Sequence, residues 1–542
     1  MADYDVVFVG AGVAAAVAGA RLAAAGAKIV FLEAGPRTER DAAVTRLRGG
    51  QYPYESPKWA PQPTSADPDH YYVQAGKVPF SSDYERRVGG TTWHWLGTCP
   101  RLLPSDFEMH SQFGVGVDWP IGYDEIESWY VQAEAELGVA GPSDYDAGSP
   151  RSAPFPMPAI PIASGDEILK EAFAKHDVRV NANPQARNSV DGYQGRHICC
   201  GNATCIPICP VQAKYDATYH IALAEDAGAE VRENAVVHRV DIGDDGNVSG
   251  VRYLSPDGAE STVTGTLYVI AANAIETPKL LLMSTQDAAP NGVANSSDQV
   301  GRNLMDHPWA RAHGVASWPY AGSRGPLSVA GGDDIRAVDT RGDFAAYRLE
   351  LGHYVGNPQD SAQEFISQGV AGQQLFQMIG KTAPYQVEIA ALLEQLPDPE
   401  NRVEADEEHL DALGLPRPKL TYSHGDYTLN GWEEAKKLFS VLLEDAGVTD
   451  IDFSEPGGAG HLLGTHRMGD DPATSVTDSY GKTHDHPNLY LAGGGLFPTV
   501  GTANPTLTIA ALALRTAEQI AGELGLVIEA TPSASPVASP VG

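Results

Sequence analysis

Basic residues are few in this chain. Lysine and arginine number 37 against 70 aspartate and glutamate residues, which gives a formal net charge of −33. Such a surface repels the phosphates of nucleic acids, so nucleic-acid binding is not expected. No run of about 18 apolar residues occurs, and we expect no direct membrane span. The opening stretch MADYDVVFVG lacks the basic segment of a cleavable signal, so we expect no signal peptide in this chain.

The remaining composition is that of a large globular protein. The hydrophobic fraction is 42% and the charged fraction 20%, which excludes a disordered chain. Glycine is frequent, with 57 residues, as suits an enzyme whose backbone closely approaches a large ligand. The chain ends in EATPSASPVASPVG, and we expect a disordered tail over 526–542.

The first readable unit is a strand, turn, helix and second strand near the N-terminus. A buried strand is predicted over 5–9, and the turn after it places Gly10, Gly12 and Ala15 in the pattern G-x-G-x-x-A. Gly10 allows the tight turn, Gly12 admits a pyrophosphate to the helix N-terminus, and Ala15 lets helix and strand pack. Glu33 ends the second strand, where a carboxylate would bind ribose hydroxyls. The pattern predicts a dinucleotide site without separating FAD from NAD, and a turn that holds no ligand is the alternative.

Four later segments carry a resemblance to a known family. They read RVGGTTWHWLGTCPRLLPSDF (87–107), AANAIETPKLLL (271–282), VGRNLMDHP (300–308) and PNLYLAGGGLFPTVGTANPTLTIAALALR (487–515). In this order they resemble the glucose-methanol-choline (GMC) family of FAD oxidoreductases, and within it the catalytic subunits of bacterial FAD-dependent sugar dehydrogenases that act on glucose, gluconate or fructose. The likeness runs from about residue 4 to about residue 520 and is thinnest over about 310–400.

The resemblance implies an α/β fold, with a Rossmann-like FAD-binding domain and a substrate domain built on a sheet. The FAD-binding domain would be discontinuous, formed by 1–309 with the cysteine loop 197–210 and by 456–525 with the catalytic residues. The substrate-binding domain would occupy 310–455. The residues themselves agree locally, since 266–273 is predicted as an apolar strand ending near a cofactor and 506–524 as a helix with an apolar face.

The resemblance also assigns residues to the cofactor. Gly89 and Gly90 would allow the backbone to approach the flavin. His94 lies where pyranose oxidases link FAD covalently through a histidine, and a histidine packed near the flavin without a bond is the alternative. The further positions that the resemblance implies for FAD binding are Thr92, Val237, Gly495 and Thr506.

Oxidation of a hydroxyl needs a base with a pKa near neutrality, which histidine supplies most often. The chain has 16 histidines, and GHLLGTHRMG contains two of them, His461 and His466. By resemblance His461 is the catalytic base, and Asn504 of TANPTLT is the partner that binds the substrate oxygen. His466 departs from the family pattern, and we interpret it as a supporting or structural residue.

Four of the five cysteines lie in HICCGNATCIPICP (197–210), and the residues alone allow three explanations. Two disulfides could form, although the lack of a signal peptide gives little support for an oxidising compartment. Structural zinc uses paired short knuckles that this spacing does not supply. An iron–sulfur cluster would suit thiolates in a short loop followed by proline, although the spacing C-x5-C-x3-C-P differs from the bacterial ferredoxin pattern.

The resemblance favours the cluster, because sugar dehydrogenase subunits of this kind hold a [3Fe–4S] cluster on three cysteines. The matching ligands are Cys199, Cys205 and Cys209, which leaves Cys200 over. Electrons would then pass singly to a cytochrome c acceptor or a dye, with a small helper subunit in the complex. The chain lacks the haem motif C-x-x-C-H, so any haem would belong to another subunit.

We therefore predict an FAD-dependent dehydrogenase that oxidises a sugar hydroxyl on an aldose, an aldonate or a glycoside. The alternatives are a carbohydrate oxidase that uses O2 and a non-catalytic electron-transfer flavoprotein. The compartment stays open between export with a helper subunit, to the periplasm or the membrane surface, and the cytoplasm.

Overall fold

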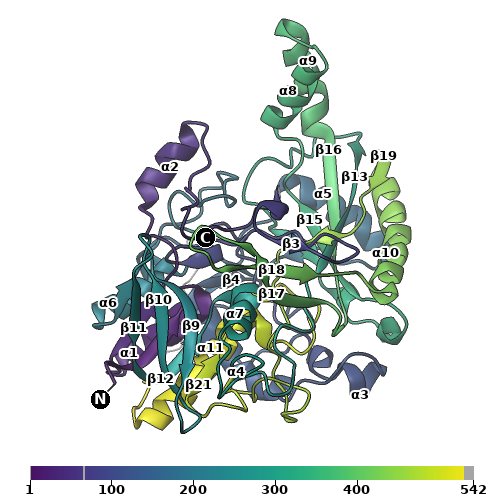
Figure 1. The fold of residues 1–542 in the computed structure, drawn as a ribbon. Coiled ribbons are helices and arrows are strands. Elements are labelled where there is room, and N and C mark those ends of the chain that lie inside the picture. Colours follow the sequence, from purple (N-terminus) through teal and green to yellow (C-terminus); the bar gives the residue numbers. More distant parts are fainter. Residues whose placement is uncertain (1, 65–66, 530–542) are drawn as a thin grey trace.

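The computed structural model describes residues 2–64 and 67–529 (Figure 1). Its first layer is a five-stranded parallel sheet in the order β21-β12-β1-β2-β8. The strands are apolar runs, as expected for a parallel sheet that helices cover. Their bounds are β1 Tyr4–Val9, β2 Ile29–Leu32, β8 Glu230–Arg232, β12 Gly265–Ile270 and β21 Leu489–Leu491.

Helices pack against this sheet and against one another, at the lower left of Figure 1. Helix α1 is rich in alanine and approaches β2 closely, since a Cβ atom at Gly19 would lie 2.3 Å from the ring of Phe31. The small side chains of α1 therefore set the helix–sheet distance. The helices of this layer are α1 Val13–Ala24, α4 Tyr123–Leu137, α6 Thr218–Asp226, α7 Asn273–Met283 and α11 Thr506–Leu524.

The second large sheet lies at the right of Figure 1 and has seven strands. Its main path is β19-β13-β16-β15-β14-β6, and β20 pairs with β13. Alternate residues such as Leu349 and Ile389 face two covering helices, and the other residues form the opposite face. The bounds are β6 Asn181–Ala182, β13 Pro308–Ala316, β14 Ala330–Gly332, β15 Tyr347–Gly352, β16 Gln386–Leu393, β19 Val448–Phe453 and β20 Gly457–Gly458, with α5 Ser164–Phe173 and α10 Asp426–Asp445 as the helices.

The seven-stranded sheet coincides only in part with the interval 310–455 that was predicted to form the substrate-binding domain. Strand β6 joins the sheet from far upstream, while β17 and β18 lie inside the interval and pair with β3 in a separate sheet. Strand pairing between distant segments assembles the sheet, and no local pattern reveals it. The interval as a folding unit stays a prediction. These strands are β3 Val73–Gln74, β17 Arg402–Leu410 and β18 Pro416–Thr421.

The smaller elements complete the body. An antiparallel sheet of β9, β10 and β11 flanks α7, and a helical hairpin of α8 and α9 extends away from the second sheet at the top of Figure 1. No helix of the described residues is long and apolar enough to cross a bilayer. The bounds are β4 Val139–Gly141, β5 Met157–Pro158, β7 Gln185–Ala186, β9 Val236–Ile242, β10 Val248–Leu254, β11 Glu260–Val263, α2 Arg40–Arg48, α3 Met109–Phe113, α8 Pro358–Ser367 and α9 Gly372–Thr382.

The chain after α11 corrects one expectation. Leu526 and Ile528 pack against the core around β1 and α1, and Arg21 donates to the carbonyl oxygen of Glu529 at 3.0 Å. The start of the predicted disordered tail is therefore packed in part, because Leu526 and Ile528 bury surface against the body while Val527 is exposed. The rest of that prediction, 530–542, lies outside the described residues.

Candidate active site

The turn between β1 and α1 runs close to the end of β12. Gly10 has a φ of +98°, and a Cβ atom there would lie 2.8 Å from the carbonyl oxygen of Ala271. Gly12 precedes α1 without a side-chain cap, and the space where its Cβ would stand is open to 4 Å. The N–H groups of the helix start are therefore free to meet a phosphate. Ala15 is buried and packs in the core instead of facing the pocket.

Glu33 holds this turn from the end of β2. Its carboxylate accepts hydrogen bonds from the N–H groups of Ala11 at 2.9 Å and Gly35 at 3.0 Å. Burial raises the pKa of Glu33, and these two hydrogen bonds oppose the rise. Each oxygen keeps a further lone pair, so the carboxylate can also accept from a ribose hydroxyl as predicted.

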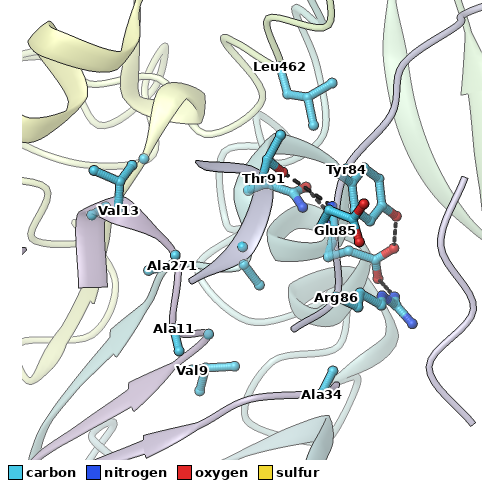
Figure 2. Close-up of a pocket in the computed structure, with 18 of the residues that line it drawn as sticks. Val9, Ala11, Val13, Ala34, Tyr84, Glu85, Arg86, Thr91, Ala271 and Leu462 are labelled. Carbon is cyan, nitrogen blue, oxygen red and sulfur yellow. Dashed lines mark hydrogen bonds and ion pairs between the residues drawn. The ribbon is translucent and has the colours of Figure 1, made fainter. Parts of the chain in front are cut away.

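A pocket opens above the turn (Figure 2). Val9, Ala11 and Ala34 form its floor, while Glu85 and Arg86 stand on a separate wall. The shape combines an apolar floor with a few polar groups, as is usual for a cofactor site. The predicted cofactor residues that line this pocket are Gly10, Gly12, Glu33, Gly90, Thr92, Val237 and Thr506.

The polar wall is a buried charge network that the sequence did not reveal. Arg86 forms an ion pair with Glu276, and Tyr84 donates to the same carboxylate (Figure 2). Although burial alone would raise it, Arg86 and Lys279 hold the pKa of Glu276 far below its usual range. Nη1 of Arg86 is buried without a partner among the described residues. That orphaned donor, the open Gly12 position and Glu33 together fit FAD.

Two adjacent glycines carry the backbone past the dinucleotide turn. A Cβ atom at Gly90 would lie 3.2 Å from the Cα atom of Gly12, so these two segments are in van der Waals contact. Gly89 has a φ of +97° and packs against Trp93, away from the pocket. Thr92 donates its hydroxyl to the carbonyl oxygen of Gly89 at 2.6 Å, which stabilises this bend beside the pocket.

Two of the predicted cofactor residues, His94 and Gly495, do not line the pocket. Nδ1 of His94 lies 3.3 Å from Glu85, a residue of the pocket wall, while His94 itself is not part of the lining. Although burial opposes the effect, His94 and Arg87 lower the pKa of Glu85 to about 2. Gly495 leaves room for the ring of His466, since a Cβ atom there would lie 1.9 Å from that ring. Gly495 therefore acts through packing, beside the lining residues that precede it.

His461 is in the lining of the pocket, on the loop after β20. Its backbone N–H donates to Asp306 at 2.8 Å, and its Nδ1 lies 3.0 Å from Nδ1 of His307. Burial, and secondarily the neighbouring His307, lower the pKa of His461 well below its usual value. The pKa therefore lies below the near-neutral value expected of the base, and the imidazole is neutral at pH 7 with one nitrogen able to accept a proton.

Asn504 lies directly before Pro505 and Thr506, which both line the pocket. Its Oδ1 is 3.5 Å from Nη1 of Arg348, which projects from the face of β15 opposite its covering helices. The guanidinium can only donate, so this contact assigns Oδ1 to Arg348 and leaves the amide N–H groups for another acceptor.

An isolated antiparallel bridge between Arg187 and Lys214 closes the segment that contains the cysteine loop. Cys205 and Cys209 are buried, Cys199 is half-buried, and Cys200 is exposed. Burial raises the pKa of Cys199, and its neighbours Cys205 and Cys209 add to the rise. No group of three His, Cys, Asp or Glu side chains within 2–64 and 67–529 converges on a single metal-ion position.

Two buried cations adjoin the thiols. Nη2 of Arg187 donates to Sγ of Cys205 at 3.2 Å, and its Nε and Nη1 are buried without partners in the described part of the chain. Burial lowers the pKa of Lys214 to about 8, while Cys205 and Cys209 oppose the fall. Nζ of Lys214 also donates to the carbonyl oxygens of Thr92 at 3.1 Å and Trp93 at 3.0 Å, which joins the loop to the pocket wall.

Comparison with known proteins decides the family. The two sequence models described as GMC oxidoreductase match residues 4–309 and 397–513. The chain belongs to the GMC oxidoreductase family. This GMC oxidoreductase is therefore an FAD-dependent enzyme that acts on CH–OH groups, and the predicted α/β fold class with a Rossmann-like FAD-binding domain is confirmed.

Individual relatives cover almost the whole chain. The chain is 37% identical to the fructose dehydrogenase large subunit of Gluconobacter japonicus, over 96% of this chain and 98% of that protein. It is 30% identical to paromamine 6'-oxidase of Streptomyces fradiae, over 96% and 92%. Among solved structures, pyridoxine 4-oxidase from Mesorbium loti superposes with a TM-score of 0.64 at 17% identity, over 95% and 99% of the two chains. The last likeness concerns the fold alone.

Proposed function

We propose that this GMC oxidoreductase is the catalytic subunit of an FAD-dependent sugar dehydrogenase. The observation that carries the proposal is the place of His461, a half-buried imidazole in the lining of the FAD pocket whose Nδ1 lies 3.0 Å from Nδ1 of His307. The similarity to a fructose dehydrogenase large subunit supports a sugar as the substrate and further subunits as partners.

The residues of this chain divide the work around the substrate hydroxyl. FAD, when bound, supplies the acceptor for the hydride that leaves the substrate carbon. His461 takes the hydroxyl proton on its free ring nitrogen, since burial keeps the imidazole unprotonated at pH 7. Asn504 donates an amide N–H to the substrate oxygen, because Arg348 occupies its Oδ1. The two groups together hold the C–O bond in one orientation.

We propose that Cys199, Cys205 and Cys209 hold a [3Fe–4S] cluster, which would supply one-electron transfer. In such a cluster each thiolate binds a different iron, so the three sulfurs need not converge on one ion. The buried cations Arg187 and Lys214 support an anionic group at this place. A cytochrome c or a dye would be the electron acceptor, and a small helper subunit would accompany the complex.

Composition of the purified protein tests the cluster. We expect about three irons and matching acid-labile sulfide per flavin after anaerobic purification. With D-fructose, D-glucose and D-gluconate as probes under argon, at least one should bleach the flavin. Turnover with a dye acceptor and little peroxide would support a dehydrogenase.

An O2-using carbohydrate oxidase is the second candidate. It is favoured by the 30% identity to paromamine 6'-oxidase. Flavin without iron, together with one peroxide formed for each sugar oxidised, would establish the oxidase and overturn the cluster.

The variant His461→Ala separates both enzymes from a non-catalytic electron-transfer flavoprotein. Reduction of its flavin by the active sugar should be lost, while dithionite should reduce it as in the wild type. His486→Ala is the matched control, because this buried histidine hydrogen-bonds to Gly246 and does not line the pocket. Normal reduction of His461→Ala by sugar would show that the assigned base is wrong.

A further inference from the structure

His307 contacts the imidazole ring of the proposed base, although it lies 154 residues away in sequence. Its Nδ1 is 3.0 Å from Nδ1 of His461, and its Nε2 is 3.2 Å from the carbonyl oxygen of Gly501. The two rings meet edge to face, with centroids 5.0 Å apart and an interplanar angle of 87°. Both ring nitrogens of His307 are thereby engaged.

The partners determine where the protons lie. A carbonyl oxygen can only accept, so Nε2 of His307 carries its proton and donates it to Gly501. Burial lowers the pKa of His307 to about 4, so the ring is neutral at pH 7 and its Nδ1 has only a lone pair. Nδ1 of His461 must then be the donor between the two rings. In a neutral His461 this leaves Nε2 without a proton, as a general base requires.

Asp306 fixes the positions of the two histidines relative to each other through hydrogen bonds to their backbones. Its carboxylate accepts the N–H groups of His307 at 2.7 Å, His461 at 2.8 Å and Gly460 at 3.1 Å. The segments that carry the two histidines are therefore joined at the main chain as well as at the side chains. Asp306 contacts the pair at the backbone, and Asp106 is a second carboxyl group whose charge acts on His307.

We propose that His307 is a positioning residue that holds His461 in the tautomer with a bare Nε2 directed to the substrate. The inference rests on the proposed function of His461, and deepens it by stating what prepares the base. Nothing in the local sequence around His461 performs this task. A ring that rotates or carries its proton on Nε2 cannot accept the hydroxyl proton, so loss of His307 should lower the rate without removing the base.

Two substitutions at one position provide the kinetic test. The carbonyl oxygen of His307→Asn lies near the place of Nδ1 and can accept from His461, whereas His307→Leu offers no acceptor. Under argon, with the sugar that bleaches the wild type, we expect reduction of the flavin in His307→Leu to slow about 100-fold. His307→Asn should stay within about tenfold of the wild type, and the KM of both should change less than their kcat. His486→Leu, a buried histidine outside the site, should match the wild type.

A tautomer measurement tests the same idea without turnover. In the FAD-loaded protein labelled with 15N-histidine, the His461 signals, assigned by their loss in His461→Ala, should show a protonated Nδ1 and an unprotonated Nε2. In His307→Leu the Nε2-protonated form should become populated. A wild-type His461 protonated at Nε2 would overturn the inference, as would equal reduction rates in His307→Leu and His307→Asn.

The two failures are distinguishable. If no sugar reduces the wild-type flavin, the proposed function fails, and the 15N spectrum of the wild type still decides the tautomer. If the wild type is reduced and His307→Leu is equally fast, the positioning role fails while the sugar dehydrogenase stands. Should His307→Leu not fold, His307→Asn and the wild-type spectrum remain as tests.

Discussion

Arg187 and Cys205 are hydrogen-bonded in the interior, with Nη2 of the guanidinium 3.2 Å from Sγ of the thiol. Arg187 is 1% exposed, and two of its nitrogens have no partner among the described residues. A buried cation with free donors is costly unless negative charge lies beside it. Thiolates and the sulfides of a cluster would supply that charge.

Arg187→Met should therefore release iron while the flavin stays bound. We expect the iron-to-flavin ratio to fall by about half or more, because a thiolate cluster is less stable without the adjacent cation. Iron and flavin are measured on the same anaerobic sample. Arg179→Met, a change at an exposed arginine, is the control, and unchanged iron in Arg187→Met would contradict the assigned role.

Gly12→Ala should abolish FAD binding and leave the fold intact. A Cβ atom at Gly12 meets no protein atom within 4 Å, and the residue has an ordinary φ of −80°, so the methyl group enters only the space reserved for the cofactor. The measurement is the flavin content after incubation with excess FAD, beside circular dichroism. Gly10→Ala provides the contrast, because its φ of +98° and the 2.8 Å approach to Ala271 should reduce stability as well. Normal flavin content in Gly12→Ala would exclude this turn as the pyrophosphate site.

Glu33→Ala should weaken FAD binding about tenfold or more. The change leaves the N–H groups of Ala11 and Gly35 unpaired, and hydrogen bonds to a charged group are each worth about 1.5–3 kcal/mol. Glu33→Gln retains one carbonyl acceptor and should give an intermediate value. Titration of the apoprotein by flavin fluorescence measures the Kd. Equal affinity in all three proteins would show that Glu33 does not organise the site.

His466→Gln should make the protein less sensitive to acid. Burial lowers the pKa of His466 from 6.5 to about 3, so the unfolded chain binds a proton that the folded one does not. The free energy of unfolding contributed by this residue therefore falls as pH drops below 6.5, by up to about 1.4 kcal/mol per pH unit. Glutamine does not titrate, so the Tm of the variant should decline less than that of the wild type between about pH 6.5 and about pH 4. Parallel Tm curves over this range would contradict a neutral buried His466.

Much of the cofactor half was readable from the sequence because its signals are local. The strand at 5–9, the glycine turn and Glu33 follow one another within about 30 residues, and each position has its own steric or hydrogen-bonding reason. The helix predicted over 506–524 is α11 at the same bounds. The structure differs at Ala15, Gly89 and Gly495, which were predicted as part of the cofactor site but pack against other protein atoms beside the pocket.

The partners of the proposed catalytic residues could not be found in the same way. His307 and Arg348 are 154 and 156 residues from the side chains that they contact, and neither is marked by a pattern of its own. The segment VGRNLMDHP contains His307, but in the sequence it served only as one of the four segments that resemble the GMC family. Buried cations such as Arg187 could not be predicted either, because the sequence does not show which charged side chains become buried on folding.

By itself, the sequence determined the dinucleotide turn and the apolar strands around it, since these depend on neighbours a few residues apart, while its resemblance to the GMC family indicated His461 as the candidate base. Only the tertiary structure decided which groups face that base and which cations meet the thiols. The physical reason is that proton position and charge stabilisation depend on distances of a few ångströms between segments that the chain brings together only on folding.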